Sequence, residues 1–108
     1  MDTDMMFENN IISDNAIDGV LFRNETAANA PHRNTFKNNT IENNGWKNGG
    51  YGFTFDSPAE NVIIEGNTIG NTKGNFTKAA VHYTKNGAPV QFTNNKTNNL
   101  PGGEVVKD

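Results

Sequence analysis

The stretch Thr35-Phe-Lys-Asn-Asn-Thr-Ile-Glu-Asn-Asn44 decides the fold, because the chain contains it four times in related form. Residues 6–15, 63–72 and 91–99 align with it without gaps. Three columns of like residues result, with members 29, 28 and 28 residues apart: Phe7, Phe36, Ile64 and Phe92; Asn10, Asn39, Asn67 and Asn95; Ile12, Ile41, Ile69 and Thr97. Self-similarity at a fixed period indicates a repeat architecture, so the chain is built from units of 28–29 residues.

A second set of similar segments lies between these units. It comprises Gly19-Val-Leu-Phe-Arg23, Gly52-Phe-Thr-Phe-Asp56 and Ala80-Val-His-Tyr-Thr84. Both sets alternate apolar and polar residues over short runs that Asn or Gly residues separate, which is typical of short strands joined by tight bends. No run has a 3.6-residue apolar period long enough for a helix. The sequence therefore predicts an all-β solenoid, a parallel β-helix of about three and a half coils with three short strands per coil.

The rhythm of Asn and Ile within the units resembles that of the right-handed parallel β-helix repeat family, the pectate-lyase-like fold. It is seen in Asn10-Ile-Ile-Ser-Asp-Asn15, Asn39-Thr-Ile-Glu-Asn-Asn44 and Asn67-Thr-Ile-Gly-Asn71, and the resemblance covers residues 6–99. It implies a right-handed coil in which the Phe/Ile column lies on the second strand and the Asn column at the bend to the third. It also implies that the Gly-Val-Leu-Phe set is the first strand, which faces the substrate groove in enzymes of this fold.

The Asn column is expected to hold the coils in register. Asn tolerates left-handed backbone angles better than other non-glycine residues, which suits a sharp bend. Amide side chains stacked coil on coil also hydrogen-bond along the axis of the solenoid. The sequence is rich in both bend formers, with 20 Asn and 11 Gly residues. We therefore assign a structural ladder to Asn10, Asn39, Asn67 and Asn95.

Composition limits the size of the core and the kinds of partner. The chain has 108 residues, of which 33% are hydrophobic, so it forms at most one small domain with a narrow core. The net charge of -3 is too small for the pattern of low hydropathy and high charge found in disordered chains. The nine Lys and Arg residues are scattered, which argues against a nucleic-acid partner, and no run is long enough to span a membrane. The absence of Cys excludes disulfides and thiolate metal sites.

Residues 1–108 are expected to form a single β-helix segment, with the repeat region at 5–99 and a polar C-terminal tail at 100–108. The tail, Leu100-Pro-Gly-Gly-Glu-Val-Val-Lys-Asp108, breaks the repeat with a Pro and two glycines. A solenoid end exposes strand edges and core, and the sequence shows no capping segment before the first repeat. The chain is therefore expected to be the C-terminal portion of a longer β-helix, and the rest of that parent β-helix is its expected partner.

Outward positions in and just after the first strand carry the residues with candidate catalytic chemistry. Asp56 and His82 fall on adjacent coils, near enough for an acid–base pair, and Arg23 lies one coil below, where it can bind a sugar carboxylate. The alternative for the same residues is structural, with an ion pair between Arg23 and Asp56 and a histidine that faces solvent. Fold alone does not carry function, so both interpretations stay open.

The glycine-rich segment Asn44-Gly-Trp-Lys-Asn-Gly-Gly-Tyr-Gly52 contains the candidate ligand contacts, Trp46 and Tyr51. Aromatic faces stack on sugar rings, and glycine-rich surroundings leave such a face exposed. The alternative is that Trp46 folds over the side of the solenoid as a satellite of the core.

The resemblance implies an extracellular or cell-surface protein that acts on or binds polysaccharide, as a lyase, hydrolase or epimerase. The catalytic residues of a polysaccharide lyase or glycoside hydrolase would then lie either here or on coils outside this chain. Lyases of this fold use calcium held by clustered carboxylates, so calcium is implied by the resemblance alone. The sequence shows no such cluster, and no metal ligand is assigned. The alternative function is that of a non-catalytic β-helix, a scaffold or a surface module for carbohydrate binding or adhesion.

Overall fold

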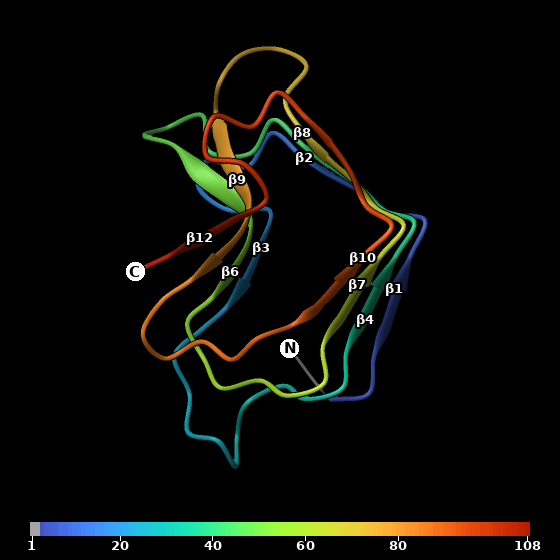
Figure 1. Ribbon diagram of the computed structural model, residues 1–108, viewed down its shortest axis with the longest axis vertical. Coiled ribbons are helices and arrows are strands. Elements are labelled where there is room, and N and C mark those ends of the chain that lie inside the picture. The colour runs from blue at the N-terminus through green and yellow to red at the C-terminus, as the bar shows by residue number, and fades with distance from the viewer. Residues whose placement is uncertain (1–2) are drawn as a thin grey trace.

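The computed structural model describes residues 3–108 and shows a parallel β-solenoid of four turns, in which twelve strands form three sheets (Figure 1). Sheet A consists of β1 (Met6–Glu8), β4 (Thr35–Lys37), β7 (Ile63–Glu65) and β10 (Gln91–Thr93). Sheet B consists of β2 (Ile11–Ser13), β5 (Thr40–Glu42), β8 (Thr68–Gly70) and β11 (Lys96–Asn98). Sheet C consists of β3 (Val20–Phe22), β6 (Gly50–Phe55), β9 (Thr77–Tyr83) and β12 (Val105–Lys107). Within residues 3–108 there is no helix that could cross a membrane.

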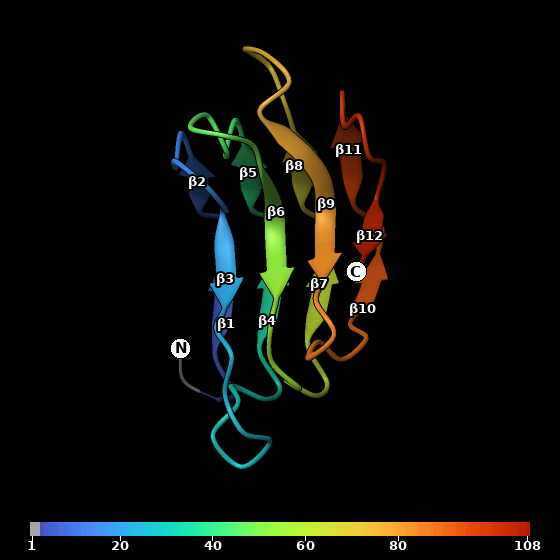
Figure 2. The ribbon, with the colours of Figure 1, turned by 90° about the vertical axis from the view of Figure 1, so that its left-hand side faces the viewer.

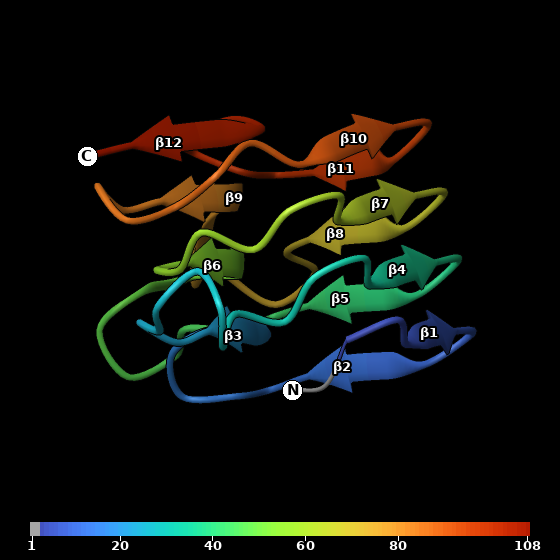
Figure 3. The same cartoon turned by 90° about the horizontal axis from the view of Figure 1, so that it is seen from below.

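Neighbouring strands pair in parallel and bring the predicted columns together. Phe7 pairs with Phe36 in sheet A, and Ile12 pairs with Ile41 in sheet B. The later turns keep the same register in both sheets. Figure 3 shows the turns stacked one above another. The predicted fold class, with three short strands per coil, is confirmed.

The core lies between the three sheets and is narrow. Aromatic rings stack from turn to turn, with ring centroids 4.8 Å apart for Phe7 and Phe36 and 4.5 Å apart for Phe22 and Phe55. Full burial of an Ile or Phe side chain contributes roughly 1.5–3 kcal/mol, so these columns supply much of the stability. The largest fully buried apolar side chains are Phe22, Phe36, Phe53, Phe55, Ile41, Ile64, Ile69, Val62 and Val81.

The bend from sheet A to sheet B uses a residue with left-handed backbone angles in every turn. These residues are Asn9, Asn38, Gly66 and Asn94, with φ of 59°, 56°, 69° and 54°. Each comes one position before a residue of the Asn column. The left-handed angle expected for the column therefore belongs to the residue before it, where Asn and Gly are again the favoured types. The Asn of the column is left to bond with the neighbouring turns.

Residues 100–108, expected to be a polar tail, contain the strand β12. This strand pairs in parallel with β9, and Val105 lies opposite Val81. A turn that begins at Pro101 and includes Gly103, with φ of 80°, leads the chain back to the sheet. Sheet C therefore has a fourth strand that the repeat alignment does not predict (Figure 2).

Candidate functional site

The Asn column forms a hydrogen-bonded ladder along the bend between sheets A and B. In each step, an Asn donates its backbone N–H and its Nδ2 to the Oδ1 of the Asn one turn further along. For Asn39 and Asn67 these distances are 2.8 Å from the backbone and 3.0 Å from Nδ2. Asn67 Nδ2 also donates to the carbonyl of Phe36 in the preceding turn, at 2.9 Å. These contacts tie neighbouring turns together, as expected for a structural ladder.

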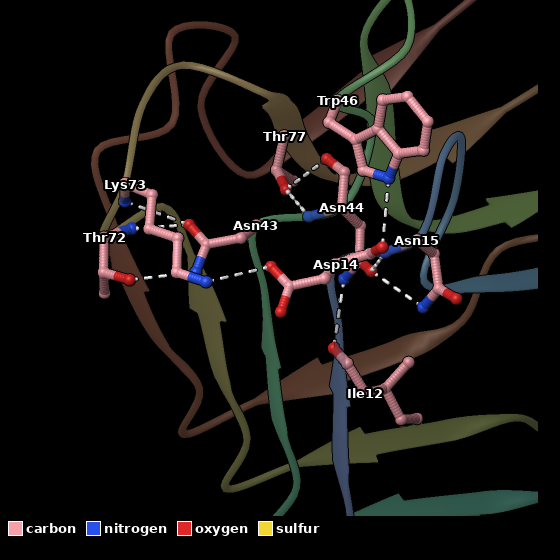
Figure 4. Close-up of polar contacts among 9 residues, drawn as sticks. All are labelled: Ile12, Asp14, Asn15, Asn43, Asn44, Trp46, Thr72, Lys73 and Thr77. Atoms are coloured by element: carbon pink, nitrogen blue, oxygen red, sulfur yellow. Dashed lines mark hydrogen bonds and ion pairs between the residues drawn. The ribbon is translucent and has the colours of Figure 1, made fainter.

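A second polar ladder, which the sequence reasoning missed, follows the bend between sheets B and C (Figure 4). Asn15 donates its backbone N–H and Nδ2 to Asn44 Oδ1, at 3.1 and 2.9 Å. The Asn44 backbone N–H donates to Thr77 Oγ1 at 3.1 Å, and that hydroxyl donates to the Asn44 carbonyl at 2.8 Å. The last Asn of the Asn-x-Ile-x-x-Asn rhythm was the available signal for Asn15 and Asn44. Nothing in the repeat marks Thr77, because it lies beyond the irregular loop of the third turn.

The outer face of sheet C brings two of the predicted residues into contact. Thr54 on β6 pairs with His82 on β9, so both side chains stand on this face. The ring of Tyr51 stacks on the ring of His82, with centroids 4.3 Å apart and planes inclined by 27°. Tyr51 is partly exposed, and the side chain of His82 is 13% exposed. The two rings form an aromatic platform across two turns of the solenoid.

Both ring nitrogens of His82 are engaged or covered. Nε2 lies 2.8 Å from Asp108 Oδ1, which is on the residue that follows β12. Nδ1 is buried and has no hydrogen-bond partner among the described residues, and the same holds for the neighbouring Thr54 Oγ1. A general base needs an accessible nitrogen within hydrogen-bond reach of its substrate. His82 therefore offers the platform its ring rather than a nitrogen poised for proton transfer.

Asp56 is held by neighbours other than the predicted His82. Its Oδ1 accepts hydrogen bonds from Thr84 Oγ1 at 2.6 Å and from Asn86 Nδ2 at 3.0 Å. The Thr84 bond first, then the Asn86 bond and the nearby His82, lower the pKa of the Asp56 carboxyl below its usual value. Asp56 is thus a stable carboxylate near the platform, able to accept hydrogen bonds and poorly suited to donate a proton.

Arg23 stands apart from Asp56. Among the described residues, ion pairs join Asp4 to Arg33 and Asp14 to Lys73, and the one histidine contact with a carboxylate joins His82 to Asp108. The ion pair between Arg23 and Asp56 that the structural alternative expected is therefore not formed. Arg23 instead lines a pocket of about 240 Å³ at the end of β3, together with Leu21, Phe22, Glu25, Asn29 and Pro31.

Trp46 lies in the loop between β5 and β6, outside the core cluster. Its Nε1 donates to the carbonyl of Asp14 in the preceding turn at 3.0 Å (Figure 4). The residue is nevertheless 56% exposed. The loop itself is fixed to that turn by the bond from the Lys47 backbone N–H to the Ala16 carbonyl, at 3.1 Å. Trp46 is therefore an anchored aromatic side chain that keeps much of its surface open to solvent.

Calcium, which the resemblance implies, has no matching ligand set in the described part of the chain. Residues 3–108 contain no group of three or more His, Asp or Glu side chains that could hold a metal ion. The carboxylates of the sheet C face are engaged with Thr84, Asn86 and His82.

A comparison with protein families gives one match. The model of the right-handed beta helix region matches residues 1–97, which is most of the chain. Searches of the curated proteins and of the solved structures returned no significant match. The matched length and the parallel solenoid of three sheets agree with each other, so the chain belongs to the right-handed β-helix family.

Proposed function

We propose that this protein binds polysaccharide on the outer face of sheet C, in an extracellular or cell-surface setting. The observation that carries the proposal is the stack of Tyr51 on His82, with ring centroids 4.3 Å apart. Exposed aromatic faces pack against the C–H faces of sugar rings, while polar groups at their edge select the hydroxyl pattern. The platform supplies the aromatic faces, and the polar residues beside it supply the hydrogen-bonding groups.

The polar neighbours are matched to sugar hydroxyls. Asp56 and Thr84 follow β6 and β9, the two strands that carry the platform, and Asp108 follows the neighbouring strand β12 and contacts His82. Carboxylates accept hydrogen bonds from hydroxyl groups, and such charge-assisted bonds are shorter and stronger than neutral ones. Because Asp56 is already oriented by two hydrogen bonds, it would lose little side-chain freedom when a sugar hydroxyl binds.

Trp46 offers a second aromatic contact. Its loop leads directly into β6 and projects past the edge of sheet C in Figure 1. Because the hydrogen bond to the Asp14 carbonyl already fixes the indole, the side chain of Trp46 loses less conformational entropy when a ligand stacks on the ring. A glycan chain that lies on Tyr51 and His82 and reaches this loop would gain two separate aromatic contacts.

The contacts of the three catalytic candidates favour binding over proton transfer. His82 has one nitrogen on Asp108 and the other buried, and Asp56 is held as a carboxylate. Arg23 is on the far side of Thr54 from His82, since the turns follow the order β3, β6, β9. We therefore place the proposed function among non-catalytic carbohydrate-binding modules, with lyase or hydrolase chemistry as the second candidate, favoured only by the family resemblance.

A glycan array followed by titration calorimetry tests this proposal. The array should include neutral oligosaccharides of cellulose, xylan and chitin together with oligogalacturonides, and the best binder should then be titrated. We expect Tyr51→Ala to weaken binding at least about tenfold, or 1.4 kcal/mol, and Tyr51→Phe to retain it. Ile17→Ala is the control, since it truncates an apolar side chain that is 60% exposed and lies in the loop before β3, outside the platform. Absence of binding to every glycan, or equal binding by the parent and Tyr51→Ala, would show that the proposal is wrong.

A further inference from the structure

The chain contains three Asn-Gly pairs, Asn44-Gly45, Asn48-Gly49 and Asn86-Gly87. An Asn that precedes Gly readily loses its side-chain amide, because a glycine leaves its backbone nitrogen open to approach by the Asn side chain. We propose that the fold directs this reaction to Asn48, a site of spontaneous conversion to aspartate and isoaspartate, and protects the other two pairs. The modification is independent of the proposed glycan binding.

The reaction at Asn48 consumes water alone. The backbone nitrogen of Gly49 gives up its proton to solvent and attacks Cγ of Asn48, the Cγ–Nδ2 bond breaks, and the side-chain nitrogen leaves as ammonia. Water then adds to one of the two carbonyls of the resulting cyclic imide and breaks that carbonyl's bond to the Gly49 nitrogen, which regains a proton. Addition at the side-chain carbonyl gives aspartate, and addition at the main-chain carbonyl gives isoaspartate, whose main chain runs through Cβ.

The side chain of Asn48 is free to reach the attacking nitrogen. Asn48 is exposed in the loop between β5 and β6, and its side-chain amide makes no hydrogen bond with residues 3–108. It can therefore rotate toward the Gly49 nitrogen without breaking a contact. The Gly49 N–H donates to the Gly45 carbonyl at 2.7 Å, but the glycine N–H of each other pair is bonded too, to the carbonyls of Asn15 and Thr84. The freedom of the side chain, and not that of the glycine N–H, separates the three pairs.

Lys78 on β9 supplies a positive charge beside Gly49. A Cβ placed on Gly49 would lie 3.0 Å from Lys78 Nζ. Lys78 is exposed, and within residues 3–108 it forms no ion pair. The attacking nitrogen is negative once it has lost its proton, and the oxygen on Cγ becomes negative as the new bond forms. A nearby cation stabilises both charges, so Lys78 should speed the reaction at Asn48.

Asn44 is held by contacts that the reaction would have to break. It is fully buried, and its Oδ1 accepts bonds from the backbone N–H and Nδ2 of Asn15, at 3.1 and 2.9 Å (Figure 4). Its Nδ2 donates to the Ile12 carbonyl at 3.1 Å. Cγ of Asn44 therefore cannot turn toward the Gly45 nitrogen unless the polar ladder between sheets B and C opens.

Asn86 is exposed but lies beside a charge of the wrong sign. Its Nδ2 donates to Asp56 Oδ1 at 3.0 Å, so the side chain is partly fixed. The carboxylate also disfavours a second negative charge next to it. The fold therefore ranks the three sites, with Asn48 the fastest, Asn86 slower and Asn44 the slowest.

Conversion of Asn48 would alter the loop that carries Trp46 and leave the rest of the solenoid in place. Aspartate at position 48 puts a carboxylate near the Lys78 ammonium. Isoaspartate also lengthens the main chain between Trp46 and β6. The same change at Asn44 would remove a buried donor from the polar ladder.

Peptide mapping by mass spectrometry measures the three rates in one sample of the folded chain, incubated at neutral pH in heavy-oxygen water. Trypsin cleaves after lysine, which places the three Asn-Gly pairs in separate peptides. Uptake of one heavy oxygen marks the route through the imide. We expect Asn48 to react at least about tenfold faster than Asn44. In urea, where the protecting contacts are lost, the three rates should converge.

Variants of two lysines on either end of β9 test the part played by the charge. Lys78→Met should slow the reaction at Asn48 about threefold, the modest effect of a charge at the surface, and Lys78→Arg should retain the parent rate. Lys85→Met, past the other end of β9, is the control and should leave the Asn48 rate unchanged. Circular dichroism shows that each variant is folded.

A rate at Asn48 in the folded chain no higher than that at Asn44 or Asn86 overturns the proposal. An unchanged Asn48 rate in Lys78→Met overturns the role assigned to Lys78.

Discussion

His82 on β9 contacts Asp108, the residue that follows the neighbouring strand β12 of sheet C. The imidazole Nε2 and the carboxylate Oδ1 are 2.8 Å apart. Asp108 is half exposed, whereas the side chain of His82 is 13% exposed. The contact fastens the end of β12 to the aromatic platform. It therefore joins the last strand of the solenoid to the candidate binding face.

Replacement of Asp108 by Ala tests this link. Because the carboxylate is half exposed, we expect the free energy of unfolding to fall by no more than about 1 kcal/mol, since exposed contacts of a carboxylate contribute little to stability. The larger effect should be local, since His82 loses the partner of Nε2 and its ring becomes freer to leave Tyr51. Urea unfolding measures the first effect, and NMR of the imidazole protons measures the second. Glu104→Ala, at another exposed carboxylate near β12, is the control and should leave the His82 signals in place.

The Asn ladder makes its central members more important than its ends. Asn67 is fully buried, accepts two hydrogen bonds and donates from Nδ2 to Phe36 and Asn95. Asn67→Ala leaves buried partners unsatisfied, each at a cost of about 1–3 kcal/mol, so we expect a loss of about 3 kcal/mol or more. Asn10→Ala, at the exposed end, removes only the bond from its Nδ2 to Asn39 and should cost about 1 kcal/mol. Chemical denaturation of the two variants compares them, and equal losses would mean that the ladder does not set stability in this way.

Burial raises the pKa of the Tyr83 phenol above its ordinary value of 10.0, against a smaller opposing effect of the bond from Val90. The unfolded chain therefore loses this proton at lower pH than the folded chain does. The contribution of the neutral Tyr83 phenol to the free energy of unfolding is fully present below pH 10.0. It is lost as the pH rises through the pKa that this phenol has in the folded chain. We expect Tyr83→Phe to remove this alkaline loss, although it also removes the acceptor of the Val90 backbone N–H, 2.9 Å away. Denaturant unfolding of both proteins from pH 8 to 11 measures the difference, and identical pH slopes would count against a partly buried phenol that stays neutral in the folded chain.

Much of the fold could be predicted from the sequence because the solenoid repeats its own packing. Phe36 and Ile41 recur at a fixed spacing since each turn stacks the same strand on the same strand. β12 could not be predicted in this way. Pro101 and two glycines interrupt the spacing before it, and the strand is three residues long, too short to show a pattern of its own.

The candidate site could be predicted only in part, because its contacts involve segments that depart from the regular repeat. Tyr51 and His82 were both identified from the sequence, Tyr51 by its glycine-rich loop and His82 by its strand position. Their stacking depends on the irregular register at the start of β6, which a gap-free alignment does not contain. Asp108 was missed because its segment was assigned to a tail, so His82 was paired with Asp56 instead.

The central claim is that glycan binds on the aromatic platform of sheet C. The most direct measurement is an NMR titration of the isotopically labelled chain with the best-binding oligosaccharide from the array. We predict that the largest shift changes occur at Tyr51, Thr54 and His82, with smaller ones at Trp46. Changes confined to the distant Asn ladder of sheets A and B, or no change at saturating oligosaccharide, would contradict the claim.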